Sequence, residues 1–167
     1  MSCLGVHFAL TESEAGHLRS LSTDEARLEH VQAVIEETYF GEHPDLKTEC
    51  DKAWDAMHRA LADGQLTWDD GNYPLSHVVL GGERLNSQDD YIISLKTPQQ
   101  VRDIATVLPD MTEREFRRRY FAIDAKSYGA PLSEEDFGST WDRFQDVRDL
   151  FNRAAKEGRY VLFTADQ

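Results

Sequence analysis

Hydrophobic and polar positions alternate over some stretches of the chain and recur at a helical period over others. Residues 3–10 alternate, which predicts an opening strand whose apolar face holds Leu4, Val6, Phe8 and Leu10. Two further short apolar segments predict strands in the middle and at the end of the chain, at residues 91–95 and 160–164. The chain therefore has strands at both ends and one between them.

Capping residues mark where the predicted helices begin. Thr11 and Glu14 form a capping box, in which the threonine oxygen accepts from a backbone amide and the glutamate reaches back. The same pattern recurs at Ser22 and Glu25, so we expect two separate helices. The apolar period of the second helix places Leu28, Val31, Thr38 and either Val34 or Ile35 inward. The predicted helices cover residues 12–21, 23–39, 46–62, 98–108, 113–121 and 134–157.

This order of strands and helices indicates an α+β fold. A chain of 167 residues without a linker or repeat predicts a single domain over residues 1–167. We expect several amphipathic helices packed on a small mixed or antiparallel sheet, with the helical layer on one face. Residues 74–80 are compatible with either a one-turn helix or a strand, and Gly81 and Gly82 predict a tight turn after them.

The predicted helix over residues 46–62 carries the candidate chemistry. Its apolar stripe holds Cys50, Trp54, Met57 and Leu61. Asp51, Asp55 and His58 form a second stripe along its flank, close enough in pairs to meet. A carboxylate that orients a histidine can serve a general base, with Ser76 or a cysteine as nucleophile. The alternative is a hydrogen-bond network at the edge of the core.

The loop after this helix combines aromatic and acidic residues. Trp68, Asp69, Asp70 and Tyr73 make our preferred surface for a protein partner, and the alternative is a solvated turn. Trp54 and His77 are further candidates for ligand contact. Arg114, Arg117, Arg118 and Arg119 form a basic cluster that can grip an anion, although interleaved glutamates favour a solvated helix face.

The net charge narrows the possible partners. With 31 acidic and 18 basic residues, the formal charge is -13. Such a surface repels phosphate backbones, so we expect no nucleic-acid binding. It suits a basic protein partner, although solubility alone would also explain it. No apolar run approaches the roughly 20 residues that span a bilayer, and no signal peptide is evident, so we expect a cytoplasmic protein without membrane association.

The cysteines and histidines give no metal motif. Cys3 and Cys50 are best interpreted as free buried thiols, and two cysteines are too few to hold zinc alone. The six histidines lack paired spacing. We therefore expect no metal and no cofactor.

The central segment resembles the YfbM-like family of small bacterial proteins, a domain family without an assigned function. The residues that carry the resemblance are Asp51-Lys52, Trp54, His58, Leu61, Gly64, Pro74-Leu75 and Leu80-Gly81-Gly82. The resemblance implies a single-domain α+β fold and a bacterial cytoplasmic protein, and it supplies no catalytic residue, substrate or cofactor.

Two hypotheses of function follow from the sequence. The first, which we favour, is an acidic protein-binding module similar to an immunity or adaptor protein. The alternative is a small-ligand binder or hydrolase-type enzyme that uses Asp51, Asp55 and His58. The absence of a recognised catalytic motif favours the binding module over the enzyme.

Overall fold

The computed structural model describes residues 4–167. Within them, five strands form one sheet in the order β2-β1-β5-β4-β3, and every neighbouring pair is antiparallel. The strands are β1 (Gly5–Leu10), β2 (Lys47–Asp51), β3 (Glu83–Arg84), β4 (Tyr91–Lys96) and β5 (Tyr160–Asp166). The α+β prediction is confirmed, and the sheet is antiparallel. Cys3, at the start of the predicted first strand, lies outside the described residues.

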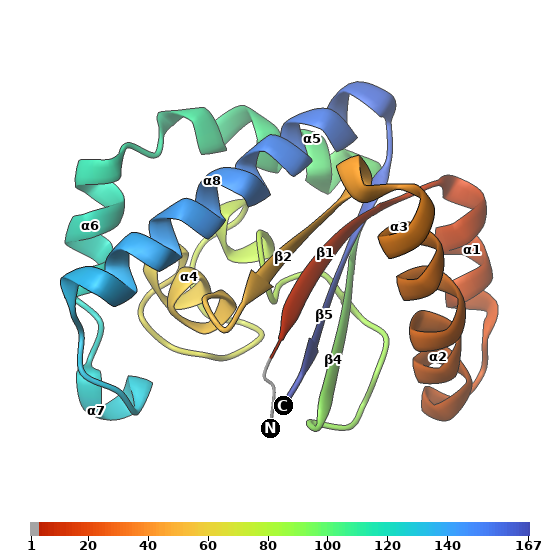
Figure 1. Cartoon of the computed structure of the whole chain (residues 1–167), viewed down its shortest axis with the longest axis horizontal. Coiled ribbons are helices and arrows are strands. Elements are labelled where there is room, and N and C mark those ends of the chain that lie inside the picture. The colour runs from red at the N-terminus through yellow and green to blue at the C-terminus, as the bar shows by residue number, and fades with distance from the viewer. Residues whose placement is uncertain (1–3) are drawn as a thin grey trace.

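Helices cover both faces of this sheet, so the expectation of a helical layer on one face is wrong. Phe8 of β1 packs against Tyr39, whereas the preceding residue, His7, packs against Phe151. Adjacent strand residues point to opposite faces, so these contacts lie on opposite sides of the sheet. Figure 1 shows α1 to α3 on one side of the strands and α4 to α8 on the other. β1 and β4 are consequently buried along their whole length.

The first helical group consists of α1, α2, η1 and α3, and the second of α4 to α8, and the chain has three further short turns. The bounds of the first group are α1 (Glu12–Ser20), α2 (Asp24–His30), η1 (Val31–Glu36) and α3 (Glu37–Glu42). The helices of the second are α4 (Trp54–Leu61), α5 (Pro98–Val107), α6 (Glu113–Phe121), α7 (Ala125–Tyr128) and α8 (Glu134–Glu157). The short turns are η2 (Pro44–Leu46), η3 (Leu75–His77) and η4 (Leu108–Asp110).

The helix predicted over residues 23–39 is present as α2, η1 and α3 in succession. The middle segment is π-helical, with a wider turn than an α-helix. Along η1 and α3, the buried positions are Val31, Ile35 and Tyr39, so Tyr39 and not the predicted Thr38 is the buried residue near the end. Of the two alternatives for the inward position, Ile35 is buried and Val34 is 47% exposed.

Local capping chemistry sets the ends of several helices as predicted. Thr11 and Glu14 form both hydrogen bonds of the capping box at α1. Thr97 and Gln100 form the equivalent pair at α5. α8 ends at Gly158, whose φ of 66° is easily adopted only by glycine. Within residues 74–80, for which the sequence allowed either a one-turn helix or a strand, Leu75–His77 forms a single helical turn.

Candidate functional site

The first part of the predicted central helix is a strand in the structure. Residues Lys47–Asp51 form β2 at the edge of the sheet, and α4 begins only at Trp54. Asp51 therefore lies on a different element from Asp55 and His58. The prediction of one helical stripe carrying all three side chains is wrong.

A β-bulge explains why the apolar spacing of this segment led to the wrong prediction of a helix. Gly5 pairs with Asp51 and Val6 pairs with Glu49, which leaves Cys50 as an extra residue in β2. Asp51 then takes a left-handed backbone with a φ of 50°. The bulge turns Cys50 into the core and exposes Asp51 at the end of the strand.

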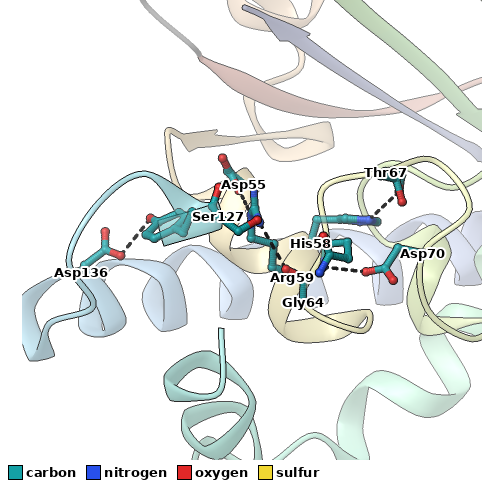
Figure 2. A network of polar contacts seen from close by, with 10 residues as sticks. Asp55, His58, Arg59, Gly64, Thr67, Asp70, Ser127 and Asp136 are labelled. Carbon is teal, nitrogen blue, oxygen red and sulfur yellow. Dashed lines mark hydrogen bonds and ion pairs between the residues drawn. The ribbon is translucent and has the colours of Figure 1, made fainter. Parts of the chain in front are cut away.

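Asp55 pairs with Arg59 one turn further along α4. Its carboxylate accepts from Nε of Arg59 at 2.6 Å. The same guanidinium donates to the backbone oxygen of Gly64 at 3.2 Å and to Oγ of Ser127 at 3.0 Å. Figure 2 shows Arg59 between these partners. Burial raises the pKa of Asp55, although the hydrogen bond from Arg59 opposes that shift. The bonds from Arg59 thus tie α4 to the loop that follows it and to α7.

His58 faces the other way, toward the loop that follows α4 (Figure 2). Its Nε2 donates to the backbone oxygen of Thr67 at 3.1 Å, and its buried Nδ1 has no hydrogen-bond partner among the described residues. Burial lowers the pKa of His58 to about 4. The imidazole is neutral near pH 7, and a carbonyl rather than a carboxylate orients it.

The predicted partner-binding loop is largely occupied with its own structure. Asp70 accepts from two backbone amides at 2.9 Å each, those of Asp63 and Gln65. Trp68 is half-buried, and its ring lies 4.9 Å from the guanidinium carbon of Arg84. Only Asp69 and Tyr73 of the predicted surface are exposed.

Tyr73 and His77 lie together beyond this loop. Their rings meet edge to face at 4.9 Å, and Tyr73 donates to Asp103. Nδ1 of His77 lies 2.9 Å from Oγ of Ser76, which is itself buried. The predicted ligand contact of Trp54 fits poorly, because Trp54 is 3% exposed and packs in the core against Phe163.

A hydrogen-bonded pair inside the sheet escaped the sequence analysis. Nδ1 of His7 lies 3.2 Å from Sγ of Cys50, and Nε2 lies 2.8 Å from the backbone oxygen of Val78. Burial raises the pKa of the Cys50 thiol and lowers the pKa of His7 to about 3. Cys50 is thus a buried free thiol, as predicted, and both partners are neutral. The alternating pattern of residues 3–10 placed His7 on a covered face but did not reveal its partner.

Lys96 is the second buried polar group that the sequence did not reveal. Its Nζ is fully buried and donates to Oγ of Ser94 at 2.9 Å and to the backbone oxygen of Val79. Burial lowers the pKa of Lys96 well below its ordinary value. These bonds fasten the turn after η3 to β4. Lys96 therefore has a structural role in this arrangement.

An open cavity of about 430 Å³ lies where the start of β1 meets the ends of β2 and β5. Leu4 and Phe40, at its wall, are 46% and 42% exposed. Glu36 accepts from the hydroxyl of Tyr91 at 3.0 Å, and burial raises the pKa of Glu36. The cavity thus combines apolar and acidic side chains. Its lining residues are Leu4, Gly5, Val6, Gln32, Glu36, Phe40, Glu49, Asp51, Tyr91, Arg143, Thr164 and Asp166.

Within residues 4–167, no three side chains of His, Cys, Asp or Glu are grouped as metal ligands. No described helix is both long enough and apolar enough to cross a bilayer.

The fold and this cavity define a small acidic α+β protein with helices on both faces of an antiparallel sheet. The chain belongs to the family described as a domain of unknown function, DUF1877, whose model matches residues 1–164. Together with the structural match that follows, this confirms the resemblance to YfbM-like proteins.

The structural comparison agrees with this family. The crystal structure of YfbM, a protein of unknown function from Escherichia coli, matches with a TM-score of 0.68 and 21% sequence identity. The match covers 97% of this chain and 99% of that one, and it supports the fold alone. A search of curated proteins finds no match.

Proposed function

We propose that this chain is an acidic protein-binding module, similar to an immunity or adaptor protein, that acts on a basic protein in the bacterial cytoplasm. One observation carries this proposal. Exposed apolar side chains, Leu4 and Phe40, share a cavity with the carboxylates of Glu36 and Asp166. Protein-binding sites commonly join an apolar contact area to charged groups that select the partner.

The overall charge supports the same partner class. A formal charge of -13 attracts basic proteins over several ångströms and raises their association rate at low salt. The same charge repels the phosphates of nucleic acids. The proposed partner is therefore a basic protein.

The cavity is better suited to the partner than the loop surface predicted from the sequence. Asp70, Trp68 and Tyr73 already have partners within the protein, although Tyr73 is exposed, as Asp69 is. The loop stays a second predicted contact. We favour the binding module over the enzyme, because His58 pairs with a carbonyl and Asp51 lies on another element.

An affinity capture with matched variants tests the proposal. The wild type, a cavity variant carrying Glu36→Gln and Asp166→Asn, and a control carrying Glu25→Gln and Glu29→Gln are immobilised separately. Both double variants remove two carboxylates, but Glu25 and Glu29 are exposed residues of α2 that do not line the cavity. Each protein is exposed to cytosol of the source bacterium, and retained proteins are identified by mass spectrometry.

We expect the wild type and the control to retain the same basic protein and the cavity variant to lose it. The purified partner should then bind the cavity variant with a dissociation constant raised about tenfold or more, which corresponds to about 1.4 kcal/mol. Equal capture by all three proteins, or capture of acidic proteins alone, would contradict the proposal. A further variant, Asp69→Lys, measures the contribution of the loop.

A further inference from the structure

A second cavity adjoins the first around the end of β2. Its volume is about 530 Å³, and it shares Asp51 and Arg143 with the first cavity. Both volumes fall in the range of sites that hold a ligand group. The second cavity is lined by Cys50, Asp51, Lys52, Ala53, Tyr128, Asp136, Ser139, Asp142, Arg143 and Asp146.

The two shared residues are held in place by the backbone and by a hydrogen bond. The bulge at Cys50 and the left-handed backbone at Asp51 bring Asp51 into the wall of both cavities. Arg143, from α8, donates to the backbone oxygen of Glu49 at 3.2 Å. This carbonyl at the edge of β2 is therefore already hydrogen-bonded. The bond opposes the pairing of an added strand at that edge.

Acidic groups predominate along both cavities. Their lining includes seven carboxylates, those of Glu36, Glu49, Asp51, Asp136, Asp142, Asp146 and Asp166, and two basic side chains, those of Lys52 and Arg143. Asp136 also accepts hydrogen bonds from Tyr120 at 2.6 Å and Tyr128 at 2.9 Å. Asp142 and Asp146 lie exposed one turn apart on α8. The surplus of negative charge extends through both cavities.

We propose that the two cavities form one groove that binds an extended basic peptide segment of the partner, an inference that rests on the proposed function. The first cavity takes a lysine or arginine side chain, with its aliphatic stem on Phe40 and Leu4 and its cation beside Glu36 and Asp166. The second cavity takes another cation of the same segment, beside Asp142 and Asp146. Charge complementarity along both cavities selects this occupant.

The groove also suggests a role for Asp51 and Lys52, two adjacent residues that carry the resemblance to the YfbM-like family. Asp51 and Lys52 stand at the junction, where Asp51 lines both cavities and Lys52 lines the second. Lys52 would repel a cation placed beside it and would instead donate a hydrogen bond to a peptide carbonyl or carboxylate. The segment therefore has its two basic residues separated by neutral or acidic ones.

A series of soluble peptides provides the test. Soluble peptides carry one basic residue, two adjacent basic residues, or two basic residues at increasing separation, each next to one leucine and otherwise in a glycine-serine background. Binding is measured by fluorescence anisotropy at low and at physiological salt. The proteins are the wild type, the first-cavity variant Glu36→Gln/Asp166→Asn, a second-cavity variant Asp142→Asn/Asp146→Asn, and the α2 control Glu25→Gln/Glu29→Gln.

We expect the wild type and the control to prefer separated basic pairs over single basic residues by about tenfold, the effect of linking two weak sites. Each cavity variant should abolish this preference. If only the first-cavity variant weakens binding, or spacing has no effect, the groove is overturned while the proposed function stands. A different result is that the wild type binds no basic peptide and still captures a basic protein that the first-cavity variant loses. That result would overturn the extended peptide segment and leave the proposed function standing. Self-association of the wild type that both cavity variants abolish would identify a second copy as the occupant and overturn the peptide.

Discussion

Cys50 donates its thiol proton to Nδ1 of His7 across 3.2 Å, inside the helix-covered sheet. The direction follows from the other ring nitrogen. Nε2 lies 2.8 Å from the carbonyl oxygen of Val78, which can only accept, so Nε2 carries the ring proton and Nδ1 must accept. A thiol–imidazole pair of this kind is a structural hydrogen bond between neutral groups. Because burial raises the thiol pKa, the reactive thiolate is scarce.

The buried thiol should resist alkylation in the folded protein. In a Cys3→Ser background, which leaves Cys50 as the one thiol, we expect iodoacetamide to label the chain only as fast as it unfolds. Labelling is followed by mass spectrometry with and without denaturant. Complete modification under native conditions, at the rate of a free cysteine peptide, would show that Cys50 is accessible and ionised.

Stability should fall in mild acid because two histidines are buried in the neutral form. Their pKa is lowered from 6.5 to about 3 for His7 and about 4 for His58. The unfolded chain therefore binds more protons below pH 6.5, and the stabilisation present above that pH is lost as the pH falls through the folded-state values. Each histidine contributes a slope of about 1.4 kcal/mol per pH unit in this window.

The contribution of His58 can be isolated with His58→Gln, whose amide can still donate to Thr67. Urea unfolding of the wild type and the variant is compared between pH 8 and pH 4. We expect their difference in free energy of unfolding to be constant above pH 6.5 and to shift in favour of the variant below it. Parallel curves throughout would show that His58 is not held neutral by the fold.

Arg59 should be one of the most sensitive polar residues in the protein. Its side chain is 7% exposed and that of its partner Asp55 is 27% exposed. Arg59→Met leaves this carboxylate without its cation and should lower the free energy of unfolding by about 3 kcal/mol. The matched control Arg114→Met, at an exposed position of α6, should change it by no more than about 0.5 kcal/mol.

A double-mutant cycle distinguishes the ion pair from the other bonds of Arg59. If the penalty comes from the unpaired carboxylate, Asp55→Leu in the Arg59→Met background should recover part of it. Failure of this recovery would place the cost in the bonds from Arg59 to Gly64 and Ser127. Chemical denaturation measured by circular dichroism gives all four free energies.

Helix ends were predictable where local chemistry determines them. At Thr11 and Thr97, the side chain three residues later completes a capping box, and both helices begin as expected. Thr112 caps α6 alone, because the carboxylate of Glu115 pairs with Arg118 and Arg119 instead. The number of hydrogen bonds at a cap thus depends on partners beyond the motif.

The edge strand was not predictable, because its pattern coincides with that of a helix. Cys50 is buried through a bulge, and the spacing from Cys50 to Trp54 happens to equal one helical turn. Pairing with β1, which lies some forty residues earlier in the chain, decided the outcome over the local period.

The cavities were not predictable either, because they form between segments that are distant in the sequence. Phe40, Asp51, Arg143 and Asp166 come from four separate elements and meet only through the sheet order. Periodicity within one segment carries no information on such a meeting. The sequence therefore indicated the charge of the proposed binding surface but not its location.

Gly5 should be intolerant of even a methyl group, because it lies against Trp54 at the start of β1. A Cβ atom at this position would lie 2.7 Å from Cδ1 and 2.9 Å from Cγ of the indole, closer than real side chains approach. Gly5→Ala should therefore lower the free energy of unfolding by about 2 kcal/mol through overpacking. The matched control is Gly16→Ala in α1, where nothing lies within 4 Å of the added atom. There the reduced freedom of the unfolded chain should raise stability by roughly 0.5–1 kcal/mol. Both values follow from urea unfolding monitored by tryptophan fluorescence, and equal stability of Gly5→Ala and the wild type would show that the indole can move aside without cost.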